Sequence, residues 1–354
     1  TAPAASSPGS CVTEACLRTR GNNQLSGLSR RYLGPLGGWL IFIAVAANRY
    51  GAMVAYMTDS GNIMVELFGQ YGLTREVGSL ILLVPSALVL YLGLKALGVG
   101  EKLISAGMVA IVCILIGATL MQDDARLAHL WQSQWQYVVP VFNLAVFVFG
   151  AQFLVPELVR GNLATPGRVP RLIVVGMLLT FLGGGGHSCP RSSPLVAPDD
   201  ISEVATLSWG RSFGRWAYYV ANTFAWLAML TSYWGLGGCL FTNIFDHFRV
   251  GSETHGRKRL AVLAAVSVPP FLLAYAGLGG FVNALYFAGT FGGVLMGIIP
   301  ILLLNAARRH GDQLPAFSCG WYAHPLIQGL IVLVFASSGV YAIASALGML
   351  PASW

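Results

Sequence analysis

Long apolar runs separated by short polar segments dominate this chain. Nine runs reach the length of a membrane helix, at 36–58, 77–94, 103–121, 136–156, 171–188, 215–245, 260–278, 281–305 and 325–348. A helix needs about 20 mostly apolar residues to cross the hydrocarbon core of a bilayer. The pattern therefore predicts an all-α integral membrane protein with about nine transmembrane helices. The segments between the runs are too short to fold as separate domains.

The fifth run is atypical in its second half. Residues 171–182 are apolar, but residues 183–193 read G-G-G-G-H-S-C-P-R-S-S, and Pro194 follows. Glycine and proline both oppose helix formation. We predict either an unwound stretch here or a short out-of-frame interval over residues 183–196, between two parts that are in frame.

Composition and charge support a membrane location. Only 10% of the residues are charged, whereas 55% are hydrophobic and the net charge is +7. Soluble domains carry about 25% charged residues. An N-terminus in the cytoplasm would place most lysines and arginines in cytoplasmic loops, among them Arg30, Arg31, Lys258 and Arg308. Because this distribution follows the positive-inside rule, topology accounts for the basic charge, and no nucleic-acid partner is expected.

Motifs for soluble enzyme chemistry are missing from the sequence. There is no Walker A motif and no H-E-x-x-H zinc motif. The six cysteines and six histidines are scattered and form no metal-ligand spacing. We therefore expect neither an enzyme nor a metal protein, and the oligomeric state stays open.

The stretch V-F-V-F-G-A-Q-F-L-V-P-E-L at 146–158 interrupts an apolar run. Gly150, Gln152 and Pro156 fall close together in it. Irregular backbone at membrane depth is tolerated where it is buried in protein or lines a cavity, and secondary transporters build binding sites from such broken helices. The alternative is a proline kink near a helix end, because Pro156 precedes the polar Glu157.

Polar residues also mark two other runs. Asn48 and Arg49 lie halfway along the first run, and Tyr50 follows them as a possible pathway residue. An arginine inside a membrane span is costly, so Arg49 either pairs with a substrate carboxylate or snorkels or stacks as an isolated substitution. Thr231 and Ser232 are hydroxyls in the middle of their run. They either bind Na⁺ or bond to their own helix carbonyls.

Small residues recur at intervals of four in the eighth run, at Gly289, Gly293 and Gly297. Small residues at this spacing allow two membrane helices to approach closely. We predict that these glycines form a packing face.

Three segments together resemble a known transporter family. They are F-V-F-G-A-Q-F-L-V-P-E-L at 147–158, the helix at 224–246 with its T-S-x-x-G-x-G-G pattern and final Asp246, and the proline–glycine block at 268–289. They resemble amino acid permeases of the aromatic and hydroxy amino acid group, which includes tryptophan and tyrosine permeases, in the amino acid–polyamine–organocation superfamily. The resemblance covers residues 11–348.

The resemblance implies a leucine-transporter-type inverted repeat and a secondary active transporter in the inner membrane. Our nine runs look like the third to eleventh helices of that fold. The family's broken sixth helix then falls on the 147–156 stretch. The implied function is symport of an aromatic or other neutral amino acid with H⁺ or Na⁺, without a cofactor. The implied ion-binding residues are Thr231 and Ser232, and the implied substrate-binding residues are Phe147, Phe149, Gly150, Ala151, Gln152, Phe153 and Trp226.

The chain departs from the family pattern at its start. The first helix of the family is absent and the second is nearly so, which predicts an N-terminally truncated chain. We expect a cytoplasmic segment at 1–35, a transporter domain at 36–348 and a tail at 349–354. A non-transporting membrane remnant with a structural or partner-binding role is the alternative function.

Overall fold

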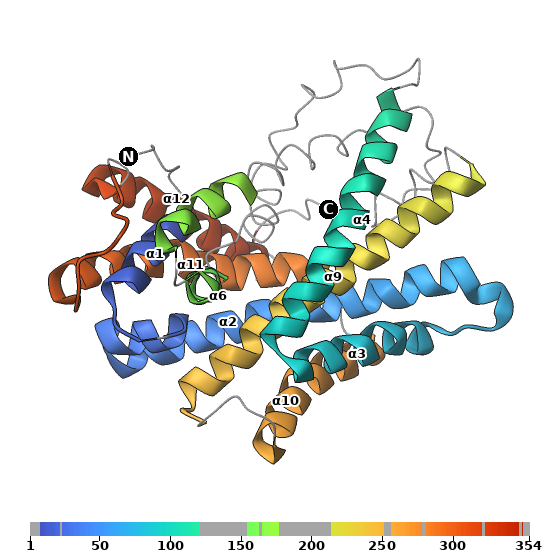
Figure 1. Ribbon diagram of the computed structural model, residues 1–354, viewed down its shortest axis with the longest axis horizontal. Helices are drawn as coiled ribbons and strands as arrows, with labels where there is room; N and C mark the ends of the chain where they lie inside the picture. Colours follow the sequence, from blue (N-terminus) through green and yellow to red (C-terminus); the bar gives the residue numbers. More distant parts are fainter. Residues whose placement is uncertain are drawn as a thin grey trace.

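The computed structural model describes residues 8–21, 23–120, 154–162, 165–176, 214–250, 256–277, 281–320, 323–346 and 349. These residues form helices and short connections (Figure 1). The elements are α1 (Pro8–Arg18), α2 (Leu25–Phe68), η1 (Gly69–Tyr71), α3 (Arg75–Leu92), α4 (Leu94–Leu120), α6 (Val155–Gly161), η5 (Pro166–Arg168), α9 (Arg215–His247), α10 (Arg257–Tyr275), α11 (Phe281–His310) and α12 (Pro325–Ala346).

The described part confirms an all-helical membrane protein. Five of its helices are long and apolar enough to cross a membrane: α2 with η1, α3, α9, α10 and the second half of α11. Large apolar side chains remain exposed on α3 and α12, including Leu80, Val84, Leu88, Leu330 and Leu333, as expected for surfaces that face lipid. The runs at 136–156 and 171–188 lie mostly outside the described residues. The nine-helix count and the leucine-transporter arrangement therefore stay predictions.

Helix α2 is longer than its apolar run. It begins at Leu25 and ends at Phe68, and a kink at Gly34, with a φ of 78°, and Pro35 divides it. Glycine permits this positive φ, and the following proline lacks a helical N–H donor. The segment 59–68, which the sequence pattern places in a loop, continues the helix because Ile63, Met64 and Leu67 are buried on one face of it.

The helices pack around α2. Figure 1 shows α2 running along the molecule, with α9 crossing it and α3 beside it. One core cluster joins the second half of α2 to α3, α9 and α10, and it includes Met53, Leu82, Tyr233 and Val266. A second cluster joins α1, the first half of α2, α6 and α11. Helix α2 thus contributes to both core clusters and connects them within the described part.

The glycines of α11 pack against neighbouring helices, as their spacing predicts. Gly289, Gly293 and Gly297 are buried. A Cβ at Gly297 would overlap the Phe335 ring of α12. Gly292, beside them, approaches Asn48 of α2, where a Cβ would lie 2.7 Å from the Asn48 Cβ. Small residues therefore let α11 approach both α2 and α12.

Replacement of Gly297 by alanine is expected to lower the stability of the α11–α12 contact by about 1–3 kcal/mol, the usual cost of overpacking. Gly329→Ala on α12 is the matched control, because no atom lies within 4 Å of a Cβ there. The midpoint of thermal unfolding in detergent measures both variants. Equal midpoints for the two variants would contradict the packing role of Gly297.

Candidate functional site

The predicted site residues divide into two groups in the structure. Residues 147, 149, 150, 151, 152 and 153 of the broken stretch lie outside the described residues and stay predictions. The other predicted residues lie on α2 and α9, which pack against each other. They are Asn48, Arg49 and Tyr50 on α2, and Trp226, Thr231 and Ser232 on α9.

Arg49 lies inside the helix bundle. Its residue surface is 3% exposed, so the side chain does not snorkel to water. The guanidinium lies near the Cys239 side chain of α9 and near Tyr56, two helical turns further along α2. A charge in a low-dielectric interior is expensive and needs an anion or hydrogen bonds to offset it, and the Cys239 side chain is one hydrogen-bond partner of Arg49.

Ser232 and Thr231 face different neighbours. Tyr56 lies within hydrogen-bonding reach of Ser232, so Ser232 joins the set around Arg49. The Thr231 hydroxyl instead donates to two carbonyls of its own helix, at 3.1 Å each, and lies 3.9 Å from the Met108 Sδ of α4. The structure brings Arg49, Tyr56, Ser232 and Cys239 together, and we call these four residues the Arg49 cluster.

Asn48 and Tyr50 make structural contacts on either side of Arg49. The Asn48 Nδ2 donates to the Ala288 carbonyl of α11 at 2.7 Å. The Tyr50 hydroxyl donates to the Ala265 carbonyl of α10 at 2.6 Å. Pro269, four residues after Ala265, has no N–H to donate to that carbonyl. Tyr50 therefore completes the hydrogen bonding of a proline-interrupted helix, and both residues hold α2 against its neighbours.

Trp226 lies nearer the other end of the α2–α9 interface. Its Nε1 donates to the Ser60 Oγ at 2.8 Å. Asp59, next to Ser60, is 2% exposed and its Oδ1 accepts from the Asn62 Nδ2 at 3.1 Å. The sequence pattern missed this buried acid by placing it in a loop. A signal was available, because Arg49, Tyr56 and Asp59 follow one another at intervals of seven and three, which places them on one side of a helix.

The ends of α2 and α9 cap each other. The Asp246 Oδ2 accepts from the backbone N–H of Gln24 at 3.0 Å, and the carboxylate also accepts from the backbone N–H of Gly27. In return, Arg30 donates to the final carbonyls of α9, those of Asp246 and His247, at 3.2 and 2.9 Å. Helix termini leave N–H and C=O groups unpaired. Here each helix satisfies the groups of the other.

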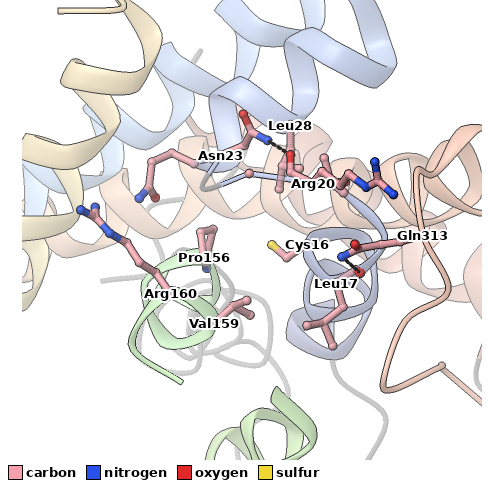
Figure 2. A pocket seen from close by; sticks show the side chains of 12 residues that line it. Cys16, Leu17, Arg20, Asn23, Leu28, Pro156, Val159, Arg160 and Gln313 are labelled. Carbon is pink, nitrogen blue, oxygen red and sulfur yellow. Dashed lines mark hydrogen bonds between the residues drawn. The ribbon is translucent and has the colours of Figure 1, made fainter. Parts of the chain in front are cut away.

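A cavity of about 210 Å³ lies beside this junction (Figure 2). Its walls come from α1, the connection at 19–24, the start of α2, α6 and Gln313. Pro156, the described end of the predicted broken stretch, lines it together with Cys16, Gln24 and Arg160. The next residue, Glu157, accepts at Oε1 from the Gln24 Nε2 at 2.8 Å. Cys239 interacts with both Glu157 and Arg49, so α6 reaches the same region as the Arg49 cluster.

A buried carboxylate ties α1 to the end of α11. The Glu14 side chain is 0% exposed. It accepts hydrogen bonds from the Arg18 Nε at 2.8 Å, from the Arg308 Nε and Nη2 at 3.0 Å each, and from the Cys319 backbone N–H at 2.6 Å. The sequence pattern did not identify this cluster, because Arg308 and Cys319 are 294 and 305 residues away from Glu14.

Curated relatives of this chain are transport proteins. It is 25% identical over 350 residues to the tryptophan-specific transport protein of Haemophilus influenzae, covering 92% of this chain and 82% of that protein. It is 24% identical over 366 residues to the tryptophan-specific transport protein of Pseudomonas aeruginosa, covering 97% and 85%. A third similar protein, from Shigella flexneri, has the same description and 24% identity over 362 residues, covering 97% and 85%.

The model of the tryptophan/tyrosine permease family matches residues 4–183 and 194–341. The unmatched interval, 184–193, falls within the glycine-rich segment that departs from a helical pattern. The two matched parts include the described helices except the last residues of α12, and the relatives of the chain are transport proteins rather than enzymes. This chain belongs to the tryptophan/tyrosine permease family.

Proposed function

We propose that this protein carries an aromatic amino acid, or another neutral amino acid, across the inner membrane by ion-coupled symport with alternating access. The names of the three relatives and the family match support an amino acid substrate. The N-terminus lies in the cytoplasm in this proposal, as the distribution of basic residues predicts. The proposed arrangement is the third-to-eleventh-helix part of a leucine-transporter-type fold.

The observation that carries the proposal is the buried Arg49 at the interface of α2 and α9. Amino acid substrates of this class share a carboxylate, and a guanidinium binds a carboxylate through two parallel hydrogen bonds. Tyr56 and Ser232 supply hydroxyls beside Arg49 that can donate further bonds to the same group. In the proposed site, the broken 147–153 stretch and Trp226 surround the rest of the substrate.

We propose H⁺ rather than Na⁺ as the coupling ion. A sodium ion at Ser232 would lie in the field of the buried Arg49 cation, which opposes its binding. Thr231 supports the same choice, since its hydroxyl is engaged with the carbonyls of its own helix. Asp59, the buried acid near Trp226, is a candidate carrier of the proton.

Uptake of radiolabelled tryptophan into proteoliposomes tests the function. Uptake is expected to follow an imposed proton gradient and to be unchanged when choline replaces sodium. Dependence on sodium with no effect of the proton gradient would reject the choice of ion but keep the transport function. If correctly folded protein shows no uptake of any neutral amino acid under either gradient, the transport proposal is wrong, and a non-transporting membrane role takes its place.

A further inference from the structure

The two sides of the Gln24–Glu157 contact are anchored very differently. On the Gln24 side, α2 and α9 are joined by the Asp246 and Arg30 caps and by a bond from the Ser26 Oγ to the Asn243 Oδ1 at 2.6 Å. On the other side, α6 has seven residues. Its apolar residues Val155 and Val159 pack in the core with α1 and α11. The side chain of Gln24 thus links a short helix to a rigid pair of long ones.

The Glu157 carboxylate is half-satisfied in this contact. Its Oε1 accepts from the Gln24 Nε2 at 2.8 Å. Its Oε2 is buried and accepts no hydrogen bond from the residues that the structure describes. A buried carboxylate oxygen without a donor destabilises the arrangement that holds it. The contact therefore joins α6 to α2 through one hydrogen bond, and the buried Oε2 adds a cost that favours breaking it.

We propose that Gln24 is a positioning residue that holds α6 against α2, and that breaking its bond to Glu157 moves α6 and opens the cavity beside Pro156. This role rests on the proposed function only for its purpose, because in that proposal the transport site lies next to α6. The contact itself joins described residues on both sides.

Cys16 is a built-in reporter of this opening. Its thiol lines the cavity between α1 and α6, and Figure 2 shows it opposite Pro156. Cys16 is only partly exposed, and burial raises the pKa of its thiol to about 12. The thiolate is the species that reacts with alkylating reagents. Release of α6 would admit water, lower the pKa of Cys16 toward its ordinary value and speed its alkylation.

The experiment measures the rate of N-ethylmaleimide alkylation at each cysteine of the purified full chain by peptide mass spectrometry. Gln24→Ala and Glu157→Ala are expected to raise the rate at Cys16 about 10-fold or more, given the strength of a hydrogen bond to a charged group. Glu157→Gln is expected to stay within about twofold of the unmodified protein, because an amide oxygen still accepts from Gln24.

Two controls distinguish a local movement of α6 from a loss of packing throughout the protein. Gln313→Ala removes another amide that lines the cavity. This amide donates to the Leu17 carbonyl of α1 at 3.0 Å, so its hydrogen bond does not involve α6. The Gln313→Ala variant is expected to leave the alkylation rate of Cys16 unchanged. Cys113, which is exposed on α4, serves as the internal reference, and the buried Cys239 and Cys319 report unfolding.

An unchanged Cys16 rate in Gln24→Ala and Glu157→Ala would overturn the proposal. So would a parallel rise at Cys16, Cys239 and Cys319, because it would show that Gln24 only supports the global fold. The labelling requires no transport. A positive result in protein that shows no uptake would therefore reject the proposed function and retain the positioning role of Gln24.

Discussion

Replacement of Glu14 by alanine is expected to destabilise the protein by on the order of 3 kcal/mol, the cost of removing one partner of a buried ion pair. The variant would leave the Arg308 guanidinium without its carboxylate in a partly buried position, and the Cys319 N–H without an acceptor. Because Glu14 joins α1 to the end of α11, the loss should separate α1 from the bundle.

The midpoint of unfolding in detergent measures this effect. Glu76→Ala is the control, since it removes an exposed carboxylate from the first turn of α3. Glu14→Gln should fall between the two, because the amide oxygen accepts some of the hydrogen bonds while its NH₂ group opposes the arginine donors. An alanine variant as stable as the control would contradict the anchoring role of Glu14.

The same contacts predict a pH dependence. Burial alone would raise the pKa of the Glu14 carboxyl, but the hydrogen bonds from Arg308, the Cys319 N–H and Arg18 together lower the pKa below its ordinary value. A carboxyl whose pKa is lowered by folding contributes stability above its unfolded pKa. That contribution is lost as the pH falls through the folded pKa. The stability gap between the unmodified protein and Glu14→Ala should therefore shrink in acid.

Replacement of Arg49 by glutamine is expected to weaken amino acid binding by about 30-fold or more, because removal of one partner of a buried charge pair costs roughly 2–5 kcal/mol. The effect should appear in the KM for uptake and in the Kd measured by scintillation proximity. Arg49→Lys should bind better than glutamine but worse than arginine, since lysine keeps the charge and loses the planar fork that matches a carboxylate.

Two variants on α9 test which hydroxyl acts together with Arg49. Thr231→Ala should keep nearly normal uptake, because its hydroxyl bonds to its own helix. Ser232→Ala should weaken binding, because Ser232 belongs to the Arg49 cluster. If Arg49→Gln unfolds at a lower temperature while the KM of the folded fraction stays normal, Arg49 is a structural residue and the carboxylate site is wrong.

Helix positions were largely predictable from the chain. The apolar runs at 77–94, 215–245, 260–278 and 325–348 agree with α3, α9, α10 and α12 to within a few residues. This agreement has a simple physical cause, since a membrane helix must satisfy its backbone internally and present apolar side chains to lipid. The end of α2 was not predictable in this way, because its last turns are held by buried contacts with other helices rather than by lipid.

The candidate site was predictable only in part. Arg49 and Ser232 could be predicted as candidate site residues because polar and charged side chains are costly in a bilayer. Nothing in their spacing showed that Ser232 faces Tyr56 while its neighbour Thr231 faces α4. Adjacent residues on a helix point about 100° apart, so the packing of α2 and α4 around α9 decides which hydroxyl joins the cluster.

The sequence by itself determined that this is a membrane protein, that it is helical and which family it belongs to. Each of these depends on local composition or on motifs within one segment. The tertiary structure alone decided which polar groups meet. Gln24 contacts Glu157 and Asp246, and Glu14 contacts Arg308, across separations of 133 to 294 residues. Such pairs depend on how whole helices pack, and a one-dimensional pattern of apolar and polar positions carries no information about that packing.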